Sequence, residues 1–151
     1  MNEMLRIQNI EINKNLNNQH EVFERIAEIA VENNFSSSKQ LVIEGLSTRE
    51  KQGTTGFMEG FAIPHTKSTA IKEPGIVIIT LSEGIEWESM DGQPARFIIS
   101  LLIPENESGT THLSLLSSIS RMLMHSEIRE SLLNASNQEE VLKELNKALS
   151  A

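Results

Sequence analysis

The sequence contains no cysteine among its 151 residues. This absence excludes disulfide frameworks, thiolate nucleophiles and every cysteine-ligated zinc or iron–sulfur site. Basic residues are also few, since 13 Lys and Arg stand against 21 Asp and Glu for a formal net charge of −8, and they are scattered along the chain. Because nucleic acids and anionic membranes attract clustered Lys and Arg, we expect no nucleic-acid partner.

Long apolar runs are missing as well. The longest nearly unbroken apolar stretches, residues 76–81 and 97–103, are far shorter than the ~20 residues that a membrane helix needs. Residues 1–11 lack the apolar centre of a signal peptide. We therefore expect a soluble cytoplasmic protein with no direct membrane insertion.

The composition is that of a globular chain, with 38% hydrophobic and 23% charged residues. A chain of this length can bury a core without disulfides or a structural metal. We find no internal repeat, low-complexity tract or linker, so we expect residues 1–151 to form a single domain.

Apolar periodicity predicts helices near both ends of the chain. Residues 20–33 read as an amphipathic helix, and Ser37 with Gln40 forms a capping-box pattern for a second helix reaching about Arg49. The expected buried side of that second helix is Leu41, Val42 and Leu46. Further helices are expected over residues 112–123, 128–133 and 137–149.

Uniform apolar runs predict strands in the middle of the chain. Residues 75–81 and 97–103 suit strands that are covered on both faces, and residues 85–90 suggest a short edge strand with Trp87 buried. Residues 61–63 are also expected to be extended, with about five strands in all. We thus predict an α/β fold with a mixed central sheet flanked by helices on both faces.

His65 is the first candidate for chemistry. It follows the glycine-rich residues 53–60 and the pair Ile63-Pro64, and because proline cannot donate to a ladder, His65 is expected just past a strand end. α/β proteins commonly build sites at such sheet edges. The alternative is a turn histidine bonded to local backbone.

His112 is the second candidate, in the expected first turn of a helix capped by Thr110 or Thr111. A helix N-terminus keeps the imidazole neutral and attracts anions such as phosphate. The alternative is a histidine packed on the face of Leu116 and Ile119. The remaining histidines, His20 and His125, lie near helix ends and are expected to be exposed or capping residues.

Arg49 and three threonines are further candidates. The planar fork of Arg49 can bind a phosphoryl oxygen, although Arg49 and Glu50 can also form a solvated, self-compensating helix end. The hydroxyls of Thr54, Thr55 and Thr66 lie on either side of His65 and can orient the imidazole or bind oxyanions, although loop threonines usually satisfy backbone. We assign the orienting of a phosphate to Thr54 and Thr66.

Other chemistries find no support in the sequence. There is no G-x-x-x-x-G-K-[ST] loop, no dinucleotide glycine spacing and no His-Glu-x-x-His helix. His65 and His112 alone are too few ligands for a metal site. We therefore expect neither a cofactor nor a metal.

The stretch REKQGTTGFMEGFAIPHT, residues 49–66, resembles the phosphorylation-site signature of the fructose/mannitol-type enzyme IIA domains of the bacterial phosphoenolpyruvate-dependent sugar phosphotransferase system. WESMDGQPARFI (residues 87–98) and HLSLLSSISRML (residues 112–123) look like the rest of that domain. The resemblance covers nearly the whole chain.

This resemblance implies a phosphocarrier. The histidine at the position of His65 accepts a phosphoryl group, usually on its ε2 nitrogen, from the phosphohistidine of the carrier protein HPr. It passes the group to a cysteine of an enzyme IIB domain, which feeds a membrane transporter. His112 matches the second active-site histidine of the family, and Arg49 matches its arginine.

Two alternatives remain open at this point. The protein can be a regulatory, nitrogen-type IIA-like protein that controls other proteins according to its phosphorylation state, or a histidine-lined binder of a small ligand. The pair Thr66-Lys67 favours the sugar-transport members. Phe57, Met58 and Phe61 are candidate rim residues around His65, with burial in the core as the alternative.

Overall fold

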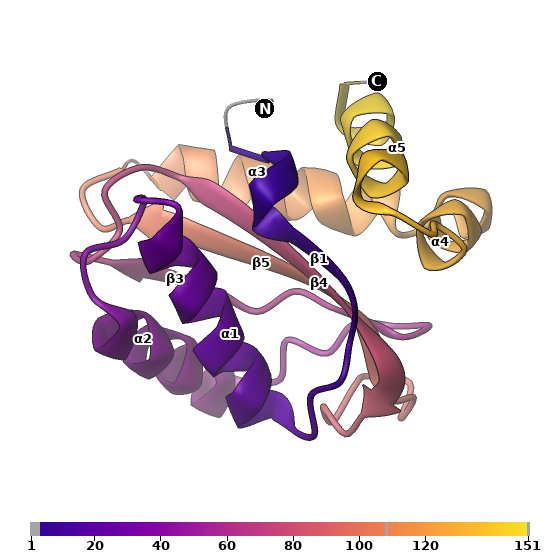
Figure 1. Ribbon diagram of the computed structural model, residues 1–151, viewed down its shortest axis with the longest axis horizontal. Helices are drawn as coiled ribbons and strands as arrows, with labels where there is room; N and C mark the ends of the chain where they lie inside the picture. Colours follow the sequence, from indigo (N-terminus) through magenta and orange to yellow (C-terminus); the bar gives the residue numbers. More distant parts are fainter. Residues whose placement is uncertain (1–3, 108, 151) are drawn as a thin grey trace.

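The computed structural model describes residues 4–107 and 109–150, with the side chains of residues 109–112 and 150 outside the described part. Its centre is a five-stranded sheet (Figure 1) in the order β1-β4-β5-β2, in which β3 also pairs with β5. The strands are β1 (Ile10–Lys14), β2 (Phe61–Ala62), β3 (His65–Ser68), β4 (Gly75–Ile85) and β5 (Ala95–Pro104).

The sheet is mixed. β4 and β5 are antiparallel, whereas β1 pairs with β4, and β2 and β3 pair with β5, in parallel. β2 and β3 lie one after the other along the same edge of β5, because Phe61 pairs with Phe97 and His65 pairs with Leu101.

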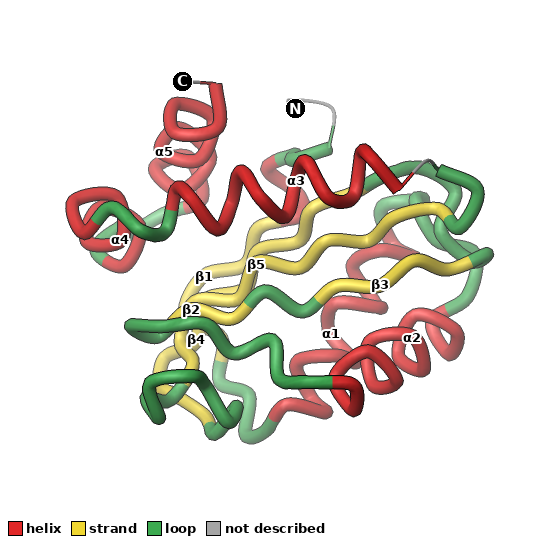
Figure 2. Tube along the Cα trace, turned by 180° about the vertical axis from the view of Figure 1, so that it is seen from behind, coloured by secondary structure: helices red, strands yellow, loops and turns green. Residues whose placement is uncertain are grey.

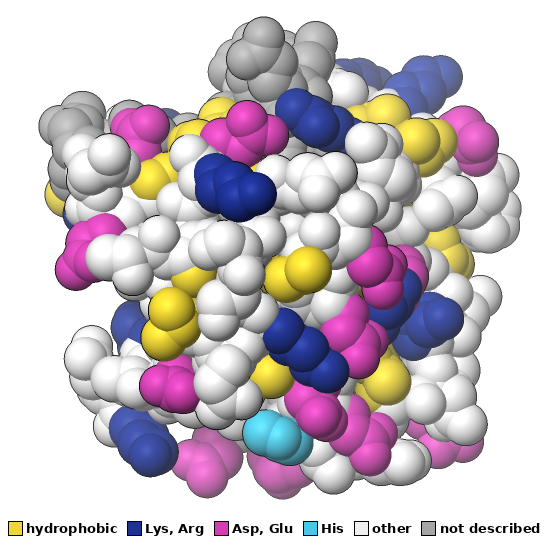
Figure 3. Space-filling model, turned by 60° about the vertical axis from the view of Figure 1, so that its left-hand side comes forward, with side chains coloured by type: hydrophobic (Ala, Val, Ile, Leu, Met, Phe, Trp, Pro, Cys, Tyr) yellow, Lys and Arg dark blue, Asp and Glu magenta, His cyan; other side chains and the backbone are white. Residues whose placement is uncertain are grey.

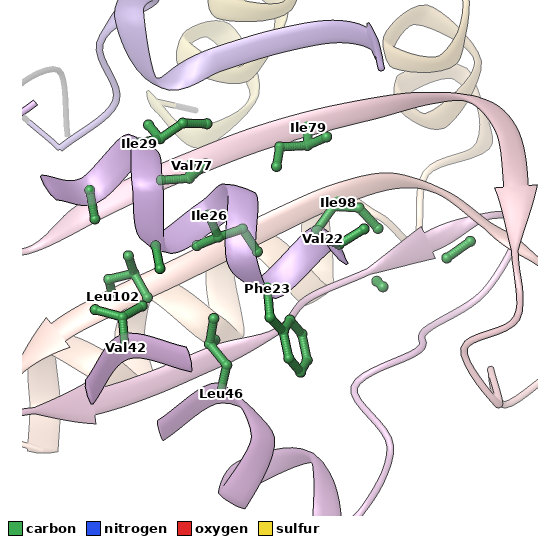
Figure 4. Close-up of a cluster of buried hydrophobic side chains, with 14 of the residues drawn as sticks. Val22, Phe23, Ile26, Ile29, Val42, Leu46, Val77, Ile79, Ile98 and Leu102 are labelled. Atoms are coloured by element: carbon green, nitrogen blue, oxygen red, sulfur yellow. The ribbon is translucent and has the colours of Figure 1, made fainter. Parts of the chain in front are cut away.

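Two helices, α1 (Gln19–Glu32) and α2 (Lys39–Gln52), cover one face of the sheet. Figure 4 shows the core on this face, where Phe23 and Ile26 of α1 pack with Leu46 of α2 against strand residues such as Val77 and Ile98. The apolar side chains on one face of each helix pack against the sheet, as helical periodicity predicts.

The C-terminal helices cover the opposite face (Figure 2). They are α3 (Gly109–Met122), α4 (Ser126–Leu133) and α5 (Gln138–Ser150), and a short 3-10 turn, η1 (Ile7–Asn9), precedes β1. Leu115 and Ile119 of α3 pack with Phe97 and Ile99 of β5. The predicted mixed α/β sheet with helices on both faces is therefore confirmed. None of the helices in the described part is long and apolar enough to cross a membrane.

The start of α2 differs from the prediction by one residue. Ser38, not Ser37, is the N-cap, and its hydroxyl accepts a hydrogen bond from the backbone N–H of Leu41. Ser37 instead donates its backbone N–H to the carbonyl of Ala70, 2.9 Å away, so this stretch is held beside another loop before the helix can begin. Leu41 is 43% exposed rather than buried, and α2 continues to Gln52.

The edge strand predicted over residues 85–90 does not form. β4 runs on to Ile85, which pairs with Ala95, and the chain then leaves the sheet. Trp87 is buried as predicted, and its ring centre lies 5.7 Å from that of Phe23 in an edge-to-face arrangement. Burial of the indole thus comes from packing against α1 rather than from a strand.

Candidate functional site

His65 lies at the break between β2 and β3. It follows the end of β2, but it is itself the first residue of β3 rather than a residue beyond all strands. The carbonyl of Pro64 accepts a hydrogen bond from the N–H of Leu101 at 3.1 Å, so the chain stays on β5 although proline donates nothing. His65 is thereby held at the edge of the sheet.

Two hydrogen bonds define the tautomer of His65. Nδ1 is 2.8 Å from the carbonyl oxygen of Ile63, and because a carbonyl only accepts, Nδ1 carries the hydrogen. Nε2 is 3.2 Å from Nε of Arg49, and because a guanidinium only donates, Nε2 keeps its lone pair. Of the two ring nitrogens, Nε2 is therefore the one that keeps the lone pair a nucleophile needs.

The surroundings of His65 favour its neutral form. Burial lowers the pKa of the imidazole, the bond to Ile63 opposes that change, and the positive charge of Arg49 lowers the pKa further. A ring whose pKa lies below its usual value of 6.5 is uncharged at neutral pH. The Nε2 lone pair is then present under physiological conditions.

Arg49 reaches His65 from the last turn of α2. Its Nη1 donates to the carbonyl of Gly53 at 2.8 Å, while its Nε donates to His65. The guanidinium is thus fixed between the glycine-rich loop and the imidazole. Two of the residues that we predicted to act together are in contact, although 16 positions separate them in the chain.

A surface depression of about 570 Å³ opens over this pair, between α2 and β3. It is lined by Leu41, Glu44, Gly45, Thr48, Arg49, Gln52, His65, Thr66 and Lys67. His65 as a whole is only 6% exposed, so the depression is its route to solvent.

On the side of the molecule shown in Figure 3, acidic and basic side chains are interspersed, without a broad patch of one sign.

The two predicted phosphate-orienting threonines occupy different surroundings. Thr66 lines the depression, and its Oγ1 donates to the carbonyl of Lys67 at 3.3 Å. Thr54 lines a neighbouring hollow of about 540 Å³, where its Oγ1 donates to the carbonyl of Trp87 at 2.8 Å. The hydroxyl hydrogen of Thr54 is therefore already used.

His112 lies in the first turn of α3, as predicted. The helix begins earlier than expected, at Gly109, so Thr110 and Thr111 are within the helix rather than at its N-cap. The side chain of His112 lies outside the described residues.

Sequence reasoning missed the role of Glu50. Its carboxylate accepts hydrogen bonds from the backbone N–H of Thr55 at 2.7 Å and from the Thr55 hydroxyl at 2.6 Å, rather than compensating Arg49. Trp87 Nε1 donates to the same hydroxyl at 3.0 Å. A glycine-rich loop leaves backbone N–H groups without helical acceptors. The position of Glu50 at the end of the preceding helix was therefore the sequence feature that could have predicted its hydrogen bonds to the loop.

The remaining candidate residues differ in how deeply they are buried. Phe61 is fully buried and packs on Phe97 with ring centres 5.0 Å apart, so it is a core residue and not a rim residue. Phe57 and Met58 are half-buried. The side chains of His20 and His125 are exposed near the starts of α1 and α4.

Residues 3–148 match the family described as "Phosphoenolpyruvate-dependent sugar phosphotransferase system, EIIA 2". The fructose-specific EIIA component from Haloferax volcanii is 35% identical over 118 residues, which are 78% of this chain and 76% of that protein. The 2-O-alpha-mannosyl-D-glycerate-specific EIIABC component from Escherichia coli is 38% identical over 128 residues, 84% of this chain. This chain spans only 19% of that longer protein.

Solved structures share the fold. The nitrogen regulatory protein IIA-Ntr from Neisseria meningitidis has a TM-score of 0.88 and 32% identity, with 95% of this chain and 97% of that chain covered. The Escherichia coli complex of enzyme IIAMTL with phosphorylated enzyme IIBMTL matches with a TM-score of 0.76 and 19% identity, covering 97% and 98% of the two chains. The family match, the identities and the fold agree, and this chain belongs to the EIIA type 2 family of the phosphoenolpyruvate-dependent sugar phosphotransferase system.

Proposed function

We propose that residues 1–151 act as one cytoplasmic phosphocarrier domain, in which Nε2 of His65 accepts a phosphoryl group from phospho-HPr and passes it to a cysteine of an enzyme IIB domain. The observation that carries this proposal is the tautomer of His65. Its Nδ1 hydrogen is bonded to Ile63, and its Nε2 lone pair is directed at Arg49.

In the loading step, a bond forms between Nε2 of His65 and phosphorus while the N–P bond of the donor histidine breaks. The electron pair of that broken bond stays on the donor nitrogen. Phosphoryl transfer depends mainly on in-line positioning and charge stabilisation. The hydrogen bond from Arg49 to Nε2 must open before attack, and its N–H groups can then bind the phosphoryl oxygens.

In the unloading step, a thiolate forms an S–P bond while the N–P bond at His65 breaks and its electron pair returns to Nε2. The thiol must come from outside these 151 residues, because they contain no cysteine. Two relatives support an enzyme IIB domain as that partner: one is named as an EIIABC component, and the other is a complex with phosphorylated enzyme IIB.

The loaded site must hold more negative charge. A phosphoryl group carries about −1.5 to −2 by analogy with other phosphorylated side chains, in a chain whose formal charge is already −8. Arg49 and Thr66 both line the depression at His65. We assign stabilisation of the dianion to Arg49, Thr66 and His112 at the start of α3, where free backbone N–H groups also favour anions.

The test is incubation with phosphoenolpyruvate, enzyme I and HPr. The wild-type protein is expected to gain one acid-labile phosphoryl group, and His65→Gln is expected to gain none. An unlabelled wild-type protein would end the proposal. The alternative that would then remain is a histidine-lined binder of small ligands, which needs no phosphoryl donor.

A second candidate is a regulatory protein, phosphorylated at the same histidine, that controls another protein instead of feeding transport. The similarity to the Neisseria meningitidis nitrogen regulatory protein favours it. The loaded protein should be mixed with purified enzyme IIB domains of several sugar classes. Rapid transfer to one IIB cysteine supports the carrier, and loss of label only by hydrolysis with every IIB supports the regulator.

A further inference from the structure

A chain of hydrogen bonds joins the carboxylate of Glu50 to the ring of His65. Glu50 accepts from the backbone N–H and the hydroxyl of Thr55, at 2.7 and 2.6 Å. The carbonyl of Thr55 accepts from the N–H of Ile63 at 3.0 Å. The carbonyl of Ile63 in turn accepts from Nδ1 of His65 at 2.8 Å.

The middle of this chain is shielded from water. Thr55 is 6% exposed and Trp87 is 2% exposed. The Thr55 hydroxyl accepts from Nε1 of Trp87 at 3.0 Å, so its single hydrogen is directed to Glu50. Hydrogen bonds in such surroundings are stronger than in water, and a missing partner costs more. Thr55 therefore has one defined position relative to α2.

The same loop also orients Arg49. Gly53, whose carbonyl accepts from Nη1 of Arg49, is two residues before Thr55. Glu50 is the neighbour of Arg49 in the last turn of α2. The hydrogen bonds of Glu50 to Thr55 thus tie this turn to the loop whose Gly53 carbonyl accepts from the guanidinium, and through Thr55 to Ile63, whose carbonyl accepts from the imidazole.

We propose that Glu50 and Thr55 are positioning residues for phosphoryl transfer, which fix the Nδ1–H tautomer of His65 and the orientation of the Arg49 guanidinium. The inference rests on the proposed carrier role. Without the hydrogen bonds between Glu50 and Thr55, the Ile63 carbonyl loses its defined position, and the neutral ring of His65 can carry its hydrogen on Nε2 instead of Nδ1. In that tautomer Nε2 has no lone pair with which to attack phosphorus.

The variants distinguish the effect of the Thr55 hydroxyl from that of the size of the Thr55 side chain. Thr55→Val removes the hydroxyl at nearly constant volume, whereas Thr55→Ser keeps it and serves as the rescue variant. Glu50→Gln removes the charge and leaves one acceptor oxygen for two donors. Glu130→Gln, an exposed carboxylate on α4, is the matched control.

Two measurements follow for each folded variant. The ¹⁵N shifts of the His65 ring in the unphosphorylated protein report which nitrogen carries the hydrogen, and single-turnover transfer from phospho-HPr gives the loading rate. We expect Nδ1–H alone and full rates in wild type, Thr55→Ser and Glu130→Gln. Thr55→Val and Glu50→Gln should show mixed tautomers and rates about ten- to a hundredfold lower, as misplaced reacting groups do.

A lower thermal midpoint in Thr55→Val, with an unchanged tautomer and an unchanged rate, would overturn the inference and leave the pair a structural one. If Thr55→Val does not fold, Glu50→Gln and Thr55→Ser carry the test with the same two outcomes. A wild-type protein that takes up no phosphoryl group would refute the carrier role, whereas the ring shifts would still decide whether Glu50 and Thr55 set the tautomer.

Discussion

Nε of Arg49 is 3.2 Å from Nε2 of His65, so under the proposed carrier role the group that would bind a phosphoryl oxygen covers the atom that would attack phosphorus. In the unloaded protein, this hydrogen bond and the one to Gly53 hold the guanidinium in place. An incoming phosphoryl group competes for the same donors. In the proposed loading step, Arg49 would therefore exchange one hydrogen-bond acceptor, Nε2 of His65, for another, a phosphoryl oxygen.

The first prediction concerns the guanidinium. Arg49→Lys keeps the positive charge but loses the planar fork that donates to two acceptors at once. We expect the rate of loading from phospho-HPr to fall about ten- to a hundredfold, measured as acid-labile phosphate in single-turnover assays. The control is Arg6→Lys at an exposed arginine that pairs with Glu73. Equal rates for Arg49→Lys and wild type would refute the assigned role.

The second prediction concerns the titration of His65. Burial and Arg49 lower its pKa, so the ring should titrate below 6.5 in NMR spectra of the folded protein. The same ring in the urea-unfolded protein serves as the reference. A folded-state midpoint at or above that of the unfolded chain would contradict the account.

A stability effect follows with a definite sign. As pH falls through the unfolded-state pKa of about 6.5, the unfolded chain gains a proton at His65 before the folded protein does. The contribution of His65 to stability is therefore fully present above that value and is lost as the pH falls towards the lower, folded-state pKa. In urea titrations, the unfolding free energy of the wild type minus that of His65→Gln should therefore decrease as the pH falls through this window. A difference that is independent of pH would show that the pKa is not lowered.

The third prediction concerns the packing of α2 on β3. A Cβ at Gly45 would lie 2.5 Å from Oγ1 of Thr66 and 3.3 Å from its Cβ. Gly45→Ala should therefore lower the unfolding free energy by about 1–3 kcal/mol, although alanine normally stabilises a helix interior by about 1 kcal/mol relative to glycine. Ser47→Ala on the same helix is the control in urea unfolding. An unchanged or raised stability in Gly45→Ala would show that the close contact does not matter.

The fourth prediction concerns His112. We expect His112→Ala to slow phosphoryl transfer with little loss of stability, because a histidine in the first turn of α3 can bind the phosphoryl group. His125→Ala, which changes an exposed histidine before α4, is the control. A marked fall in the unfolding free energy of His112→Ala would instead identify a histidine that is packed in the core.

Sequence periodicity predicted much of the fold because most helices bury one stripe and the central strands are covered on both faces. It failed where neighbouring positions compete. Leu41 and Val42 are both apolar, and only the direction of α2 decides that Val42 is buried and Leu41 is exposed. The break between β2 and β3 also depends on tertiary structure, because both strands extend the same edge of β5.

The candidate site was predictable in its residue types but not in its contacts. The proximity of Arg49 and His65 depends on how closely α2 approaches β3, and Gly45 permits that approach. The bond between Glu50 and Thr55 depends on the path of a glycine-rich loop that has no periodic pattern. These relationships come from packing and from backbone hydrogen bonds that periodicity does not encode.

The most direct test is the mass of the intact protein after incubation with phosphoenolpyruvate, enzyme I and HPr, followed by ³¹P NMR of the product. The account predicts a single added phosphoryl group with the resonance of an Nε2-phosphohistidine, absent in His65→Gln and lost in mild acid. An unchanged mass, or a phosphoryl group that persists in His65→Gln, would contradict the assignment of His65 as the carrier of the phosphoryl group.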